Sequence, residues 1–155
     1  MATTREEVCN AAIATRLATV TGAITHRNWD AEITELTPST PVVLQYDAEA
    51  TATSIVLGAL EYEMAPTVEG YVTSALADPT ARAADLDARA DALYRLVYLA
   101  LFSDSTLGGA AFDCVIAKKT PSEGRAAFAG PVKCFEVTLV VQFRTSEAAP
   151  DQAAA

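Results

Sequence analysis

The sequence predicts an α+β fold in which two helices pack on one face of an antiparallel or mixed β-sheet. Two stretches repeat apolar residues at the three-to-four spacing of an amphipathic helix. Several others alternate apolar and polar residues with the period of two of a strand. The order is helix, strands, helix, strands, which is typical of α+β proteins. The length of 155 residues fits one domain, predicted at residues 1–145, followed by a flexible, alanine-rich tail at 146–155.

The first helix is predicted at residues 4–20. A threonine precedes it as a cap, and Glu6 and Glu7 lie in its first turn, where the helix dipole favours negative charge. Gly22 ends it. Its apolar stripe comprises Val8 or Cys9, then Ala12, Ile13, Leu17 and Val20.

Strands are expected at residues 24–29 and 42–46, joined by a polar, proline-containing connection. The second of these is apolar at nearly every position, which indicates a central strand. Residues 47–54 are predicted to form a turn or loop. Residues 55–63 and 67–74 read as two strands, or as one long bent strand, because Pro66 cannot donate a ladder hydrogen bond.

The second helix has the strongest start signal, Asp78 at the cap followed by Pro79 at the first helical position. Its C-terminal half is apolar nearly all round, so it has more apolar surface than one sheet face can cover. We therefore expect Tyr94, Tyr98 or Phe102 to contact another element or another subunit. After this helix, strands are predicted at residues 111–119 and 132–145, with a flexible loop between them.

The side chains that usually carry chemistry are scattered. Cys9, Cys114 and Cys134 form no CxxC pair and have only His26 as a histidine companion, so no zinc site of the usual kind can be assembled. Three buried free cysteines are the favoured interpretation, and a Cys–His nucleophile pair is the weaker alternative. Phosphate-binding loops and hydrolase motifs are also missing, so no catalytic residue, metal or cofactor is predicted.

The formal net charge is −9, and the only adjacent basic pair is Lys118 and Lys119. An acidic surface without a basic patch argues against a protein that grips phosphate. The chain start lacks the pattern of a signal peptide, and no apolar run approaches the roughly 20 residues of a transmembrane helix. A soluble protein made in the cytoplasm is expected, with no membrane partner.

Several local strings, in this order, resemble the tail terminator and tail-completion proteins of long-tailed bacteriophages. The similarity spans about residues 5–145. It rests on RLATVTG at 16–22, PVVL at 41–44 with acidic residues after it, VEGYV at 68–72, TLGG at 106–109 and VVQFRT at 140–145.

The resemblance implies a virion structural protein of the tail or neck, made in the host cytoplasm and without enzymatic activity. Family members form a homo-oligomeric ring, usually a hexamer, that caps the tail tube protein and receives the head–tail connector protein. DNA would pass through this ring without specific binding. Glu61, Glu63 and Glu69 share strand parity and are therefore expected to form an acidic, channel-facing stripe that repels the phosphate backbone. The alternative interpretation of these glutamates is a solvated outer surface.

Two other classes of function stay open at this point. One is another head–tail neck protein, such as a head-closure or tail-tube protein. The other, which the lack of convergent polar residues disfavours, is an enzyme or a small ligand-binding domain.

Overall fold

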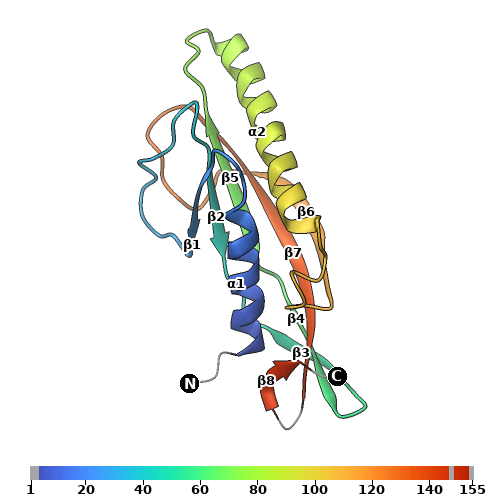
Figure 1. Cartoon of the computed structure of the whole chain (residues 1–155). Helices are drawn as coiled ribbons and strands as arrows, with labels where there is room; N and C mark the ends of the chain where they lie inside the picture. The colour runs from blue at the N-terminus through green and yellow to red at the C-terminus, as the bar shows by residue number, and fades with distance from the viewer. Residues whose placement is uncertain (1–3, 147–148, 154–155) are drawn as a thin grey trace.

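A computed structural model describes residues 4–146 and 149–153 of the chain (Figure 1). The two helices are α1 (Arg5–Leu17) and α2 (Pro79–Phe102). The strands are β1 (Ile24–Arg27), β2 (Val42–Tyr46), β3 (Thr51–Val56), β4 (Ala59–Met64), β5 (Thr67–Thr73), β6 (Asp113–Ser122), β7 (Val132–Ser146) and β8 (Ala149–Ala153).

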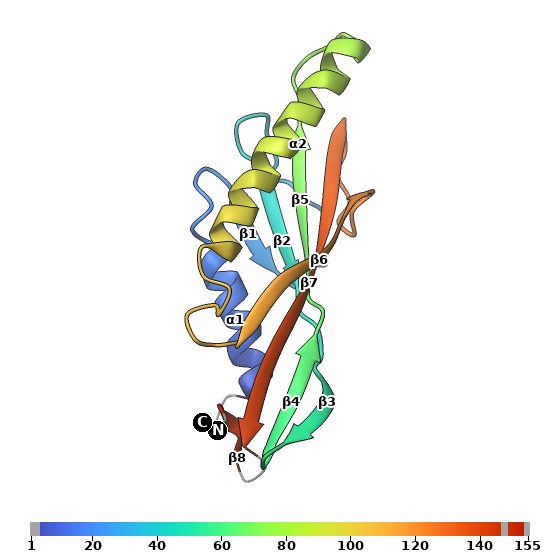
Figure 2. The ribbon, with the colours of Figure 1, turned by 90° about the vertical axis from the view of Figure 1, so that its right-hand side faces the viewer.

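Strands β1 to β7 form one mixed sheet around the long strand β7. Its order is β1-β2-β5-β7-β4-β3, so β5 and β4 lie one after the other along one side of β7, and β6 pairs with the other side. The β1–β2 pair is parallel and the other pairs are antiparallel. Both helices cover the same face of the sheet (Figure 2), which confirms the predicted α+β class.

Helix α1 begins as predicted, because the Thr4 hydroxyl accepts a hydrogen bond from the Glu7 backbone N–H at 3.3 Å. It ends at Leu17, three residues before the predicted end. The chain then turns through residues 18–22, where Gly22 has a φ of 79° that a side-chain-bearing residue rarely adopts. Val20 is still buried, although it lies in the turn.

Helix α2 also begins as predicted, with the Asp78 carboxylate accepting a hydrogen bond from the Ala81 N–H at 2.9 Å. The helix is 24 residues long. Its inward stripe packs on β5 and β7 and consists of Ala90, Leu93, Val97 and Leu101.

Strands β4 and β5 form one interrupted line opposite β7. The same register continues from Met64 paired with Val141 to Thr67 paired with Thr138, so the chain does not slip at the break. The break is at residues 65–66, where Pro66 has no N–H to donate but still accepts a hydrogen bond from the Leu139 N–H at 2.9 Å. Side chains therefore keep the predicted alternation across the proline.

The hairpin of β3 and β4 corrects two sequence predictions. Residues 47–54 were predicted as a turn or loop and 55–63 as one strand, but β3 begins at Thr51 and the chain reverses at Leu57 and Gly58. Both turn residues have positive φ, 49° and 78°, as a tight hairpin turn requires. Leucine is uncommon in this conformation, so the turn has a weak sequence signal.

The C-terminal third is more regular than predicted. Strand β6 continues to Ser122, beyond the predicted end at residue 119, because Thr120 and Pro121 still pair with β7. The predicted flexible tail differs as well: within it, Ala149–Ala153 pair as β8 with the end of β7. The rest of that prediction, at residues 147–148 and 154–155, lies outside the described residues.

The sheet has a hydrophobic cluster on each face. The larger one lies under both helices and includes Ile13, Val68, Val97 and Val137. A smaller cluster lies on the opposite face, where the connections β1–β2 and β6–β7 cover the strands, and it includes Ile33, Leu36, Leu44, Tyr71 and Cys134. The face without helices is therefore covered at its β2–β5 end and more open toward β4.

Candidate assembly surfaces

The C-terminal half of α2 leaves one flank uncovered. Leu96, Tyr98 and Leu99 keep 42%, 47% and 55% of their surface exposed, although the opposite flank of the same helical turns is packed on the sheet. Large apolar side chains clustered at one place on a soluble protein usually mark an interface. The exposed flank of α2, defined here by these three residues, is the first candidate assembly surface.

The three predicted interface residues fall into different environments. Tyr94 packs edge-on against Phe135, with ring centroids 5.7 Å apart, and the Lys119 ammonium lies 3.8 Å from the centre of its ring. Tyr98 lies over Phe102, with centroids 5.1 Å apart, and is the more exposed of this pair. Tyr94 thus packs on strands of its own sheet, while Tyr98 faces outward, and contact of these side chains with another subunit stays a prediction.

Sequence reasoning missed Leu96 and Leu99. They lie on the side of α2 that faces the C-terminal end of α1, where they line a hollow together with Val20 and Ala100. The signal was present, because the helix is apolar all round at these turns. Which side of the helix stays uncovered depends on where α1 packs, and the residues around Leu96 and Leu99 do not indicate that position.

Glu61 and Glu63 lie on the face of the sheet opposite the helices. Glu61 is opposite Arg144 of β7 and accepts hydrogen bonds from the Ser54 hydroxyl at 2.6 Å and from Arg144 Nε at 2.7 Å. These two donors, Ser54 first, hold the pKa of Glu61 below its ordinary value. Glu63 is exposed and 3.3 Å from the Gln142 amide. The orientation of these two carboxylates toward a channel stays a prediction.

Glu69 corrects the predicted acidic stripe. Its register opposite Glu136 of β7 places it on the same face as Glu61 and Glu63, as strand parity predicted. It is nevertheless fully buried, because the β6–β7 connection lies over it. A carboxylate in this position cannot line a channel of the folded chain, so the predicted stripe is reduced to Glu61, which is half-buried and paired with Arg144, and the exposed Glu63.

The buried Glu69 instead holds the β6–β7 connection on the sheet. Its carboxylate accepts a hydrogen bond from the Tyr71 hydroxyl and a second from the Arg125 backbone N–H at 3.1 Å. The Tyr71 oxygen in turn accepts one from the Ala126 N–H at 3.1 Å. Burial, followed by the bond to Glu69, raises the pKa of Tyr71 above its ordinary value. Arg125 lies 3.8 Å from Glu69 and compensates part of its charge.

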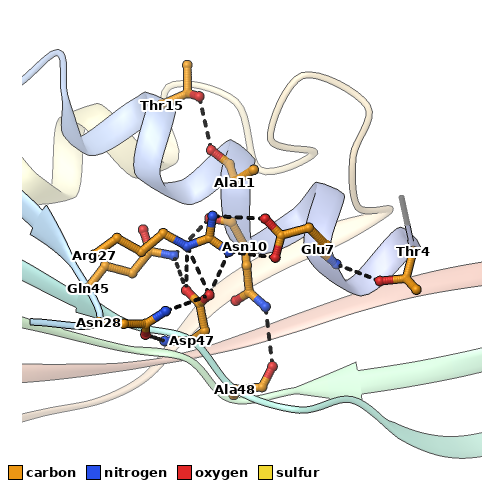
Figure 3. A network of polar contacts seen from close by, with 10 residues as sticks. All are labelled: Thr4, Glu7, Asn10, Ala11, Thr15, Arg27, Asn28, Gln45, Asp47 and Ala48. Carbon is orange, nitrogen blue, oxygen red and sulfur yellow. Dashed lines mark hydrogen bonds and ion pairs between the residues drawn. The ribbon is translucent and has the colours of Figure 1, made fainter. Parts of the chain in front are cut away.

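A polar network fixes α1 against the sheet (Figure 3). Arg27, at the end of β1, donates two hydrogen bonds to Glu7 of α1, at 2.9 and 2.7 Å. The same guanidinium contacts both carboxylate oxygens of Asp47, after β2, at 2.9 and 2.6 Å. Gln45 adds a link, because its amide donates to the Asn10 carbonyl at 2.8 Å and to Asp47 at 3.0 Å.

The network controls the charge of Asp47. Burial opposes ionisation of this carboxyl, but hydrogen bonds from Arg27, Asn28 and Gln45 outweigh it and hold the pKa of Asp47 below its ordinary value. Asp47 therefore stays ionised as the partner of Arg27, whose own pKa is raised chiefly by this bond.

The cysteines are buried, and the histidine is held by contacts with neighbouring side chains. Burial raises the pKa of the Cys9 thiol to about 11, and those of Cys114 and Cys134 to about 12. His26 stacks on Trp29, with ring centroids 4.1 Å apart, and its Nε2 lies 2.6 Å from Glu35. Within the described residues, no group of three or more His, Cys, Asp or Glu side chains could hold a metal ion. None of the described helices is both long and apolar enough to cross a membrane.

Comparison of the chain with protein-family models and with curated proteins gives no match. The assignment of a function therefore depends on the surfaces described above and on the order of the sequence strings.

Proposed function

We propose that this chain is a non-enzymatic structural subunit of a bacteriophage tail, of the tail terminator kind. Copies of it form a ring, with six as the expected number, at the end of the tail tube. The ring receives the head–tail connector, and DNA passes through it. The resemblance of five ordered sequence strings to tail terminators supports this role, as does the α+β arrangement of two helices on one sheet face.

The observation that carries the proposal is the exposed flank of α2. Leu96, Tyr98 and Leu99 expose three large apolar side chains within four residues of one helix. Covering such a surface by a second chain removes it from water, at about 25 cal/mol per Å² of apolar area. A chain that works as part of a closed assembly is expected to keep a surface of this kind.

The charge of the chain is compatible with a passage for DNA. A net charge of −9 gives no general affinity for phosphate, so DNA would not adhere to the subunit. Glu63 would act in the same sense if its sheet face lines the ring, because carboxylates repel phosphate within about 8–10 Å at physiological salt, whereas the charge of Glu61 is balanced by Arg144.

The test is particle assembly with and without this chain. Without it, we expect filled heads and separate tails instead of joined particles, and addition of the purified chain should restore joining. A Leu99→Glu variant, which places a charge on the exposed flank, should fold but fail to restore joining. Val115→Glu, a charge placed on an equally exposed apolar residue of β6, is the control and should restore it. Normal particles in the absence of the chain would contradict the proposal.

A further inference from the structure

The tip of the β3–β4 hairpin carries apolar side chains with no cover. Leu57 is fully exposed and Ile55 is 69% exposed, both near the turn. The hairpin extends the sheet at the end opposite to the start of α2 (Figure 1). Leu57 has a φ of 49°, so its backbone adopts a strained left-handed conformation. Its exposed apolar side chain adds a second unfavourable free energy, that of hydration.

The outer strand of this hairpin has less of the usual protection of a sheet edge than β6 has. Sheet edges are commonly blocked by lysine, proline or a bulge. Strand β6, on the other side of the sheet, has all three: Lys118 and Lys119, Pro121, and a register shift after Ile116. Strand β3 has the sequence TATSIV, which contains no charge and no proline, so the register shift between Ala52 and Ser54 is its one protective feature. The end of β3 next to the turn is therefore less protected against pairing with another chain than β6.

The other half of the molecule has an apolar hollow that could accept an apolar side chain such as those at the hairpin tip. It has a volume of about 310 Å³ and lies between α2, the end of β5 and the β1–β2 connection. An apolar cavity of about 150 Å³ already admits a benzene molecule, so this one has room for a branched aliphatic side chain. Its apolar lining comprises Pro38, Pro41, Val72, Ala92, Leu93 and Leu96.

The charges of the two surfaces are compatible with a contact between them. The hairpin residues 51–64 contain two charged side chains, Glu61 and Glu63, both acidic. The hollow has one charged lining residue, Arg89, and the neighbouring hollow on the other side of Leu96 also has one, Arg16. Both arginines are already paired with aspartates of the same chain, at 2.8 and 3.1 Å, and Glu61 is paired with Arg144. Neither hollow is lined by a carboxylate, so the exposed Glu63 would meet no like charge among the lining residues.

We propose that the β3–β4 hairpin of one copy docks on α2 of the next copy, with Leu57 in the hollow bounded by Pro38, Val72 and Leu93. The β3–β4 hairpin and the hollow lie in opposite halves of the same molecule, so the contact between copies is head-to-tail. Head-to-tail contacts close into a ring when the rotation between neighbouring copies permits it. Leu96, which lines the hollow, joins this contact to the exposed flank of α2. The inference deepens the proposed ring-forming function and rests on its self-assembly.

Cysteine cross-linking tests the contact directly. Leu57→Cys in one sample and Ser39→Cys in another place one thiol at the hairpin tip and one at the rim of the hollow. The native thiols are buried and give little background. Mixing the two variants under mild oxidation should give a cross-linked dimer, and a chain with both substitutions should give a ladder of higher oligomers. Val115→Cys, equally mixed with Leu57→Cys, is the matched control and should stay uncross-linked.

Sedimentation of Leu57→Ser gives a second measurement. This variant should fold normally and weaken self-association by at least about tenfold, whereas Val115→Ser should not. Dimers formed by Leu57→Cys alone would indicate hairpin-to-hairpin pairing and overturn the proposal, as would a wild-type chain that stays monomeric at all concentrations. Rings without the Leu57–Ser39 cross-link would refute this docking and leave the proposed function intact. Cross-linked assemblies that fail to join heads to tails would support this docking and refute the proposed function.

Discussion

Replacing Gly70 by alanine tests how α2 is seated on the sheet. Gly70 of β5 lies directly opposite Phe135 of β7, and the Phe135 ring covers the space that a side chain at position 70 would occupy. A Cβ atom added to Gly70 would be 2.3 Å from Phe135 Cζ and 2.5 Å from its Cε1. Favourable carbon contacts are at about 3.5–4.0 Å, so the ring has to move by about 1 Å.

The ring has little freedom to do so. Phe135 is buried, and Tyr94 of α2 packs edge-on against it with planes 86° apart. Moving the ring therefore displaces α2 as well. Overpacking of a filled core costs about 1–3 kcal/mol, and we expect Gly70→Ala to lower the free energy of unfolding by about 2 kcal/mol. For a chain of this size the melting temperature should fall by about 4–8 °C.

Urea unfolding followed by circular dichroism provides the assay, in the form of a double-mutant cycle. In a Phe135→Leu background the smaller side chain leaves room for the methyl group, so Gly70→Ala should cost less than about 0.5 kcal/mol. Gly58→Ala is a control for strain alone, because its φ is 78° but its Cβ would meet no atom within 4 Å. An equal cost of Gly70→Ala in both backgrounds, or a stabilising effect, would refute the steric explanation.

Three further predictions concern the network, the β6–β7 connection and the thiols. The pKa of Asp47 is depressed on folding, so its contribution to stability is present above the unfolded value of about 3.9 and is lost as the pH falls through the folded value. Asp47→Asn should thus be less stable at pH 7, with Arg27 left partly unpaired, and should lose less stability than the wild type between pH 5 and 2 in urea titrations. Tyr71→Phe removes a buried hydroxyl that bonds Glu69, and should cost about 1–3 kcal/mol and accelerate tryptic cleavage after Arg125; unchanged cleavage would mean that the connection is held otherwise. The three cysteine thiols should resist a disulfide reagent at pH 8 in the native protein and all react in urea, whereas fast labelling of the native chain would contradict their burial.

Local signals in the sequence predicted most of the elements. The Asp78–Pro79 start of α2 and the period of two in β7 are properties of a few neighbouring residues, and both are present in the structure. The β3–β4 hairpin was missed because its turn has a leucine at a positive φ, where glycine, asparagine or aspartate would have been recognised.

The surfaces were less predictable, since they depend on segments that are distant in sequence. Strand parity correctly placed Glu69 on the face of Glu61 and Glu63, but its burial is caused by a connection more than 50 residues later. In the same way, the surroundings of Leu96 and Leu99 depend on the C-terminal end of α1, a segment distant in sequence that lines the hollow beside them. Such burial follows from long-range packing, which residue patterns do not encode locally.

The most direct test of the central claim is the position of this chain in assembled particles, determined by electron cryomicroscopy. The proposed role predicts a single ring of copies between the tail tube and the head connector, with density that fits the two-helix sheet and the β3–β4 hairpin reaching the neighbouring copy. Density for the chain repeated along the whole tube, or none in particles whose heads and tails are joined, would contradict it.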